Sequence, residues 1–118
     1  MLRSTEELHS KGKVAMDKIA LLQEILAQNP NDAFARYGLA MEHANQGDTA
    51  TALDQFQLLT TAHPDYAAGY QMSAQLLLKS GRDAEARQRL EAGVAAARRT
   101  GNALALREMS AMLDELSV

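Results

Sequence analysis

A repeat of 34 residues is the feature that most constrains how this chain can fold. Five pairs of residues recur at this spacing: Pro30 and Pro64, Gly47 and Gly81, Ala40 and Ala74, Ala52 and Ala86, and Phe56 and Leu90. A fixed period of this length is typical of stacked helical repeats, in which each unit contacts only its neighbours. The sequence therefore predicts an extended repeat array, an architecture usually used to bind other macromolecules.

Breaks in this pattern divide the chain into six predicted helices, which indicates an all-α fold. Their approximate ranges are 17–28, 32–46, 48–62, 66–80, 84–99 and 103–116. Proline pushes the residue before it out of helical geometry, so Pro30 and Pro64 mark helix boundaries. Gly47 and Gly81 are expected to close helices, because glycine takes a left-handed conformation without steric cost. Aromatic residues make up only 4% of the chain, which favours helix over strand.

Composition narrows the chemistry and the setting. The chain has 118 residues, no cysteine and a net charge of −3. This length suits one domain with a core of its own, and the charge gives no global attraction to nucleic acid or to an anionic membrane. The N-terminus lacks the apolar core of a signal peptide. No apolar run approaches the roughly 20 residues that span a bilayer. We therefore expect a cytoplasmic protein with no membrane partner.

Residues 1–15 differ from the rest of the chain. They are polar and weakly patterned, so we expect a flexible segment with at most a short helix near residues 4–10. Two interpretations stay open: Met16 could be the native start, or the segment could fold back over the binding surface of the array. The folded domain is expected to span residues 16–118.

The repeated residues resemble the tetratricopeptide repeat (TPR) family, whose 34-residue unit is a pair of helices, A and B. The family motif places apolar and small residues in helix A, glycine in the turn, alanine and a large apolar residue in helix B, and proline at the end. The matching residues are Leu39, Ala40, Gly47, Ala52, Phe56 and Pro64 in the first copy and Tyr70, Ala74, Gly81, Ala86 and Leu90 in the second. The resemblance implies a right-handed α–α superhelix, the TPR solenoid.

The resemblance also divides the chain into two full helical hairpins with one further helix at each end. Repeat 1 is about 33–66 and repeat 2 about 67–100. The preceding helix corresponds to an N-terminal half-repeat, and residues 103–116 correspond to a C-terminal capping helix that solvates the last hairpin. Gly93 stands where the family has alanine. Because glycine within a helix costs about 1 kcal/mol, we expect the capping helix to cross close to Gly93.

TPR arrays bind ligands in a concave groove lined by their A helices, and the resemblance implies which side chains line it here. Nine residues occupy these positions: Phe34, Tyr37, Met41, Asn45, Gln71, Gln75, Lys79, Met109 and Met112. Aromatic and methionine side chains suit an adaptable apolar contact, and the polar ones could bond a peptide backbone. The alternative is structural: Phe34 and Tyr37 would pack on the N-terminal helix, and Met109 and Met112 on the second hairpin.

These features predict a non-catalytic scaffold that binds a peptide or helix of an unidentified partner protein and needs no cofactor. The alternative is self-association as a weak homodimer through the same apolar face, because an array usually needs three or more repeats for stability. Some TPR proteins grip a C-terminal carboxylate with lysine and asparagine. The corresponding positions hold Tyr37, Met41, Met72, Asn102 and Leu106. We therefore expect no binding of acidic chaperone tails.

The remaining polar residues indicate no second site. Six arginines lie in the last third of the chain: Arg82, Arg87, Arg89, Arg98, Arg99 and Arg107. They could contact an anion or RNA, but no aromatic stacking platform accompanies them. A solvated face with helix pairs such as Arg87 with Glu91 is therefore favoured over nucleic-acid binding. The three histidines lie in different segments with no metal-ligand spacing, and no paired carboxylates suit acid–base work.

Overall fold

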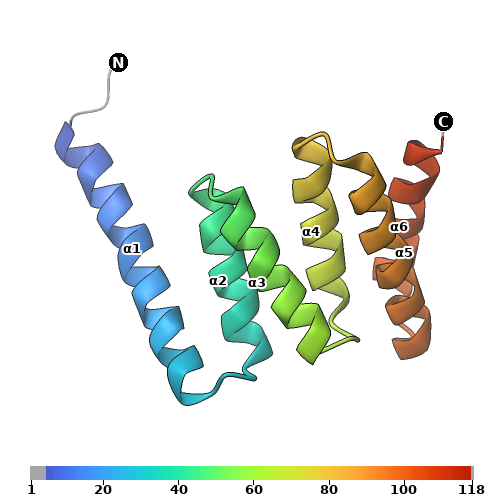
Figure 1. Cartoon of the computed structure of the whole chain (residues 1–118), viewed down its shortest axis with the longest axis horizontal. Helices are drawn as coiled ribbons and strands as arrows, with labels where there is room; N and C mark the ends of the chain where they lie inside the picture. Colours follow the sequence, from blue (N-terminus) through green and yellow to red (C-terminus); the bar gives the residue numbers. More distant parts are fainter. Residues whose placement is uncertain (1–4, 118) are drawn as a thin grey trace.

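Six helices, and no strand, make up the part of the chain described by the computed structural model, which covers residues 5–117 with side chains from residue 12 onward. The helices are α1 (Thr5–Gln28), α2 (Ala33–Asn45), α3 (Thr49–Ala62), α4 (Ala67–Lys79), α5 (Asp83–Thr100) and α6 (Ala103–Leu116). They stand side by side in chain order (Figure 1), and each packs on the one before it. The expected all-α superhelix of helical repeats is confirmed.

Short polar side chains begin three of these helices. The Asp32 carboxylate accepts a hydrogen bond of 2.9 Å from the Ala35 amide at the start of α2. Asp48 accepts one of 3.2 Å from Thr51 at the start of α3, and Asn102 caps α6 in the same way. These bonds satisfy amides that have no partner within the helix. Side-chain caps therefore begin both helices of the first hairpin and the last helix, whereas neither helix of the second hairpin has one.

Glycine closes the first helix of each hairpin, as the sequence predicted. Gly47 has φ 81° and Gly81 has φ 72°, so both are left-handed. The residues after them, Asp48 and Arg82, donate their amides back to helix carbonyls at 2.9 Å. This arrangement reverses the chain within a few residues, and it sets α2 against α3 and α4 against α5.

Small residues let the helices of each hairpin approach closely. Four alanines at the repeated positions have no exposed surface: Ala40, Ala52, Ala74 and Ala86. Phe56 and Leu90, which are 1% and 0% exposed, fill the space between neighbouring repeats. The motif residues recognised in the sequence thus form the packed interior of the array.

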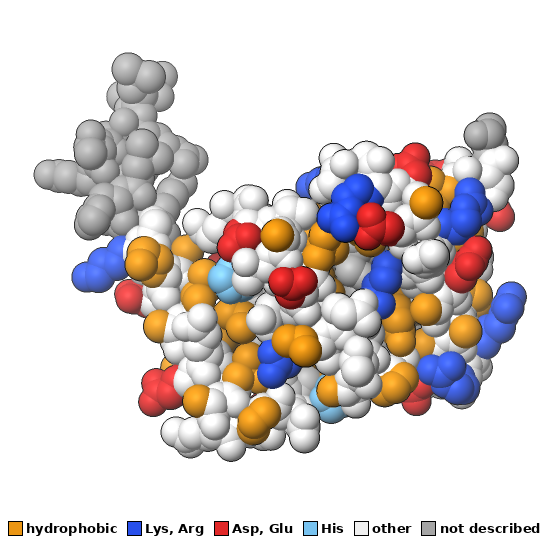
Figure 2. All heavy atoms as spheres, viewed as in Figure 1, with side chains coloured by type: hydrophobic (Ala, Val, Ile, Leu, Met, Phe, Trp, Pro, Cys, Tyr) orange, Lys and Arg blue, Asp and Glu red, His pale blue; other side chains and the backbone are white. Residues whose placement is uncertain are grey.

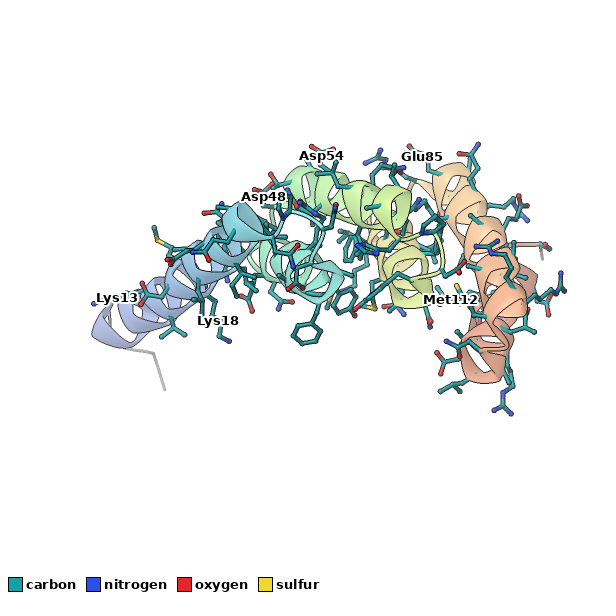
Figure 3. The ribbon with its side chains drawn as sticks, turned by 90° about the horizontal axis from the view of Figure 1, so that it is seen from below. Lys13, Lys18, Asp48, Asp54, Glu85 and Met112 are labelled. Atoms are coloured by element: carbon teal, nitrogen blue, oxygen red, sulfur yellow. The ribbon has the colours of Figure 1, made fainter. Side chains whose placement is uncertain are left out.

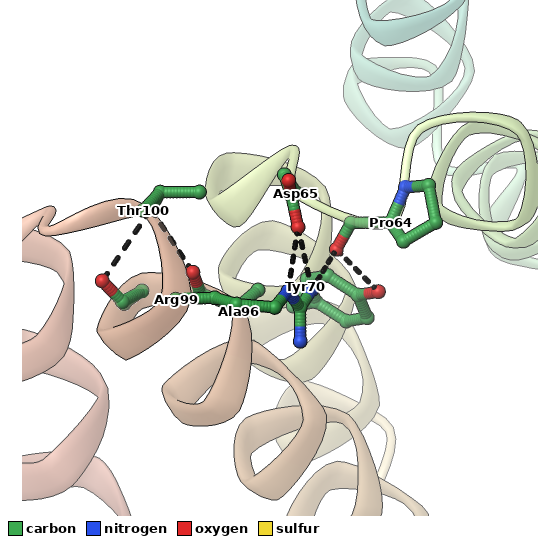
Figure 4. A network of polar contacts seen from close by, with 7 residues as sticks. Pro64, Asp65, Tyr70, Ala96, Arg99 and Thr100 are labelled. Carbon is green, nitrogen blue, oxygen red and sulfur yellow. Dashed lines mark hydrogen bonds and ion pairs between the residues drawn. The ribbon is translucent and has the colours of Figure 1, made fainter.

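The loop between the two hairpins is anchored by polar contacts from the second repeat (Figure 4). The carbonyl oxygen of Pro64 accepts hydrogen bonds from the Tyr70 hydroxyl at 2.9 Å and from Arg99 Nη2 at 3.2 Å. Arg99 also forms an ion pair with Asp65 at 2.6 Å. These contacts tie the end of repeat 1 to both α4 and α5.

The helix α1 is longer than predicted. It begins at Thr5 rather than at Asp17. Residues 5–15 show no apolar periodicity, so the pattern that predicts the other helices is missing from this part of α1. Polar helix-forming residues suffice, and Gly12 is tolerated with no atom within 4 Å of its missing side chain. Residues 1–4 lie outside the described residues, and the flexibility expected for residues 1–15 stays a prediction.

Candidate binding groove

The row of helices is arched, with distinct outer and inner faces (Figure 3). Asp48, Asp54 and Glu85 lie along the outer side of the arch, whereas Lys18 and Met112 lie toward its inner side. The helices α2 and α4 correspond to the two A helices of the repeats. The surface between these two helices is therefore the candidate binding surface.

A hollow of about 120 Å³ lies between α2 and α4. Its lining residues come from three helices: Met41, Ala44 and Asn45 of α2, Phe56 of α3, and Met72, Gln75, Leu76 and Lys79 of α4. Aliphatic, aromatic and thioether groups form most of this lining, and two amides and one ammonium group are placed among them. Such a mixture can hold an apolar side chain while the polar groups bond the backbone beside it.

Tyr37 forms part of the groove wall by packing on other aromatic rings. Its ring centroid lies 6.2 Å from that of Phe56 with an interplanar angle of 65°, an edge-to-face contact. It also lies 5.7 Å from the ring of Tyr66. Burial, together with the neighbouring Tyr37, raises the pKa of Tyr66. The Tyr66 phenol is therefore neutral at physiological pH and adds no charge to the wall.

The structure brings four of the nine predicted groove residues into the hollow: Met41, Asn45, Gln75 and Lys79. Tyr37 lies beside them in the apolar cluster around Phe56. Phe34 does not pack on α1 as the structural alternative proposed, since 79% of its surface is exposed.

The three remaining predicted residues have other roles. Gln71 donates a hydrogen bond of 2.8 Å from Nε2 to Glu108. Met109 was placed in the groove incorrectly, because it has no exposed surface and lies in the core of the second hairpin. Met112 packs partly buried against the same core. For Met109 and Met112 the structural alternative is therefore the correct one.

The error at Met109 has a geometric cause. The first residues of α4 and α6, Ala67 and Ala103, are 36 residues apart rather than 34. Two extra residues rotate a helical face by about 200°. Counting in steps of 34 consequently assigned core positions of α6 to the groove.

Sequence reasoning missed Met72 and Leu76 as lining residues. Met72 was considered only as a position of the absent carboxylate clamp. The two are four residues apart, so they share one face of α4 and reach the hollow together. That apolar pair, adjacent to the predicted Gln71 and Gln75, was the available signal.

The outer face carries both signs of charge, as Figure 2 shows for the side that it displays. Arg82 pairs with Glu85 at 2.7 Å, and its hydrogen bonds lower the pKa of that carboxyl. Arg87 donates to the carbonyl of Leu116 at 3.0 Å, so the pair with Glu91 expected from the sequence is replaced by a contact with the end of α6. These engaged arginines support a structural role over an anion site.

Arg89 is the most buried of these arginines. Its guanidinium bonds Ser73 at 3.0 Å and Thr60 at 2.8 Å, and lies 4.8 Å from the ring centroid of Tyr70. A weaker bond of 3.3 Å reaches Gln57. Burial lowers the pKa of Arg89, although an arginine remains charged at any physiological pH. Through these contacts α5 is fixed to both α3 and α4.

The described residues contain neither a group of metal-ligating side chains nor a helix suited to span a membrane. Among residues 12–117, whose side chains the structure describes, no three His, Cys, Asp or Glu side chains are grouped as a metal ion would require. No helix within residues 5–117 is both long enough and apolar enough to cross a bilayer.

Comparisons with known proteins point to one family. Residues 43–109 match one family model described as Tetratricopeptide repeat, and residues 21–54 match a second with the same description. A TPR repeat-containing protein of Pseudomonas aeruginosa is 32% identical over 95 residues, which cover 80% of this chain and 90% of that protein.

Solved structures show the same architecture. The solution structure of a tetratricopeptide repeat domain protein from Salinibacter ruber is 30% identical, with a TM-score of 0.70, over 75% of this chain and 89% of that one. The TPR2B domain of yeast Sti1, solved in a complex with pHsp70, is similar in fold with a TM-score of 0.79. It is 18% identical, and the match covers 95% of this chain and 89% of that one.

Proposed function

The chain belongs to the tetratricopeptide repeat family, a family of non-catalytic protein-interaction modules, and from this premise we propose that it binds a peptide or helix of a partner protein between α2 and α4. The observation that carries the proposal is the hollow of about 120 Å³ between these helices. Its position on the inner side of the arch leaves it open to a ligand that runs across both helices.

The chemistry of the hollow indicates the kind of ligand. Met41, Met72 and Leu76 offer flexible apolar contacts to one anchoring side chain of the partner. Asn45 and Gln75 can donate to and accept from a peptide backbone. Lys79 adds a positive charge, so we propose that an acidic residue follows the apolar anchor in the bound segment. An apolar anchor within a polar rim is the usual arrangement of a binding hot spot.

The yeast domain solved with pHsp70 supports protein binding by this fold, but the ligand proposed here is different. The positions of the carboxylate clamp hold residues such as Tyr37, Met41 and Met72. We therefore expect no recognition of a C-terminal carboxylate. A fluorescence titration with a peptide ending in Glu-Glu-Val-Asp tests this point. Binding at micromolar concentration would contradict it.

A comparative pull-down tests the groove itself. We expect wild type to capture a partner that Met41→Glu and Met72→Glu both lose, because a carboxylate in the hollow must be desolvated against apolar groups. Leu58→Glu is the matched control, since Leu58 is exposed on α3, outside the hollow. Retention of the partner by the two groove variants, with their helical circular dichroism unchanged, would refute the proposal.

A homodimer that uses the same face is the second candidate, and the exposure of Phe34 favours it. A phenylalanine with 79% of its surface exposed is an obvious site for association. Light scattering of wild type and Phe34→Ala separates the two candidates. A dimer that dissociates in this variant would support self-association. A wild-type monomer of 12.8 kDa at high concentration would eliminate it.

We further propose that residues 16–118 act as one binding domain in the cytoplasm. The absence of cysteine from the whole sequence is consistent with a reducing compartment.

A further inference from the structure

The last helix presents a face that nothing covers among the described residues. In α4, Tyr70, Ala74 and Leu77 are 8%, 0% and 4% exposed, because α5 packs over them. The residues of α6 that are 36 positions later are Leu106, Ser110 and Leu113, and they are only partly buried. This face of α6 is equivalent to the face of α4 that packs against its B helix, α5.

The equivalence of α4 and α6 is supported by their buried residues as well as by their first residues. Gly69 and Ser73 are buried in α4, and so are Ala105 and Met109, which stand 36 residues later in α6. The two helices therefore turn the same face toward the helix before them. The difference between them lies on the opposite face, where no helix among the described residues follows α6.

In the first helix, α1, the exposed face is the one that a B helix normally packs against its A helix. In α3, Ala52 and Leu59 have no exposed surface because they face α2. The residues of α1 that are 34 positions earlier are Lys18 and Ile25. The side chain of Lys18 is 60% exposed, and Ile25 is 37% exposed. Leu21, 59% exposed, lies on the same helical face. Among the described residues, this B-type helix thus has no A-type partner before it.

We propose that this protein associates with further copies of itself head to tail, so that α1 of one copy packs on the open face of α5 and α6 of the next. The new pair would repeat the geometry of α2 with α3 and of α4 with α5. It would complete a helical hairpin from the two unpaired ends. The inner groove has no part in this contact.

The surroundings of Arg89 show how the two ends match. Arg89 is the residue of α5 that lies over Tyr70, and it bonds Ser73 and Thr60. Its equivalent in α1, 68 residues earlier, is Leu21. An apolar side chain in this place needs apolar neighbours instead of hydroxyl groups.

The open end supplies those neighbours. The equivalents of Tyr70, Ser73 and Thr60 are, in that order, Leu106, Met109 and Val94. The two hydroxyl groups that bond Arg89 are thus replaced by apolar side chains. Met109 has no exposed surface and Val94 is 7% exposed, so the partly buried Leu106 is the neighbour that Leu21 of the second copy would contact. The residues at the two ends thus both differ from the Arg89 arrangement in the apolar direction, as a packed contact between them requires.

Space and charge also favour this occupant. A hollow of about 490 Å³ lies between α5 and α6, and its lining residues are Glu91, Val94 and Arg98 of α5 and Ser110, Leu113 and Asp114 of α6. Lys18 occupies the position of Ala52, so its stem would lie over the small side chain of Ser110. Within one chain the Lys18 ammonium group lies 3.9 Å from the Glu42 carboxylate of α2, and Asp114, one helical turn beyond Ser110, would offer it a second carboxylate. An exposed pair of this kind is weak and screened by salt.

The proposed contact joins two different surfaces, so it is heterologous and does not close at two copies. Such contacts generate open chains of subunits, or rings where the rotation permits. We therefore expect a mass that grows with concentration instead of a fixed dimer. A dimer through the inner groove would behave differently, because it would join the same surface of both copies.

Two variants, each blocked at one end, test the proposal by sedimentation velocity. Leu21→Glu places a carboxylate in the apolar contact at the N-terminal end, and Ser110→Glu fills the close approach at the C-terminal end. We expect each variant alone to remain a monomer of 12.8 kDa at concentrations where wild type associates. In an equimolar mixture, the unchanged α1 of the Ser110→Glu variant can still pack on the unchanged α5 and α6 of the Leu21→Glu variant. The mixture should therefore form a species of two chains and no larger one.

Phe34→Ala is the control, because this exposed residue of the inner side should leave the head-to-tail contact unchanged. Circular dichroism verifies that each variant is folded, and Val14→Glu, on the same face of α1, replaces Leu21→Glu if that variant fails to fold. The proposal is overturned if wild type is a monomer at millimolar concentration. It is also overturned if the single variants associate, if the mixture of folded variants stays monomeric, or if Phe34→Ala abolishes association.

Discussion

Gly93 of α5 and Met109 of α6 are so close that no side chain fits between the two helices at this point. A Cβ atom on Gly93 would lie 2.5 Å from Met109 Sδ and 2.8 Å from Cβ of Tyr70. The glycine is therefore where α6 and α4 approach α5 most closely, and it explains the departure from the family's alanine. The close crossing expected from the sequence is confirmed.

Replacement of Gly93 by alanine should destabilise the protein, although alanine is the better helix former. The overlap with the backbone-linked Cβ of Tyr70 cannot be relieved by a rotamer change, so we expect a loss of about 1–3 kcal/mol. In thermal unfolding this corresponds to a decrease in Tm of roughly 4–12 °C for a chain of this size.

Gly12→Ala is the matched control for this substitution. Gly12 lies within α1 and has no atom within 4 Å of the position of a Cβ. Here the propensity of alanine acts alone, and the protein should gain up to about 1 kcal/mol. Equal stabilisation by Gly93→Ala would show that the helices are not in close contact at Gly93.

Arg89 should contribute to stability through its contacts with two other helices. Arg89→Met keeps most of the aliphatic stem but removes the hydrogen bonds to Ser73 and Thr60. We expect a loss of about 1–2 kcal/mol in the free energy of unfolding, measured in urea. Arg89→Lys should not restore it, because one ammonium group cannot reproduce the planar fork of the guanidinium.

Arg107→Met provides the comparison on an exposed helical surface of α6. A surface substitution of this kind should change stability by less than about 0.5 kcal/mol. A similar small effect at Arg89 would mean that its hydrogen bonds do not hold α3, α4 and α5 together.

The cap of α3 predicts a dependence of stability on pH. Hydrogen bonds from Thr51 are the largest influence that lowers the pKa of Asp48, and His43 adds a smaller attraction. Because the folded pKa lies below the unfolded one, the stabilisation is present above the unfolded value and is lost as the pH falls through the folded value. We expect this loss below about pH 4, where an aspartate of ordinary pKa protonates.

Asp48→Asn isolates this contribution, since asparagine caps a helix but does not titrate. Urea unfolding between pH 6 and pH 3 should show a shallower acid loss in the variant than in wild type. Parallel curves for the two proteins would remove Asp48 from the explanation of acid sensitivity.

The fold could be predicted because its determinants are local. Proline before each hairpin, Gly47 and Gly81 after the first helices, and small residues such as Ala40 and Ala52 all recur at one spacing. Each acts within a few residues of its position. The beginning of α1 could not be predicted in this way, because residues 5–15 carry no apolar periodicity and none of the repeated motif residues.

The site was predicted less completely, because it depends on the orientation of one helix relative to another. Met41 and Gln75 lie where the repeat register placed them. Met109 does not, because the change in spacing before α6 becomes visible only when the end of α5 at Thr100 is known. Leu76 was missed because whether a side chain belongs to core or groove depends on how far α2 and α4 stand apart.

The measurement that most directly tests binding between α2 and α4 is methyl NMR of the protein labelled at methionine, titrated with the partner segment recovered by pull-down. Met41 and Met72 line the hollow, whereas Met16 is 71% exposed on α1 and Met109 is fully buried. We predict saturable shifts of the Met41 and Met72 methyl signals with little change at Met16. Unchanged signals of Met41 and Met72 at saturation, with shifts at Met16 instead, would contradict binding in this groove.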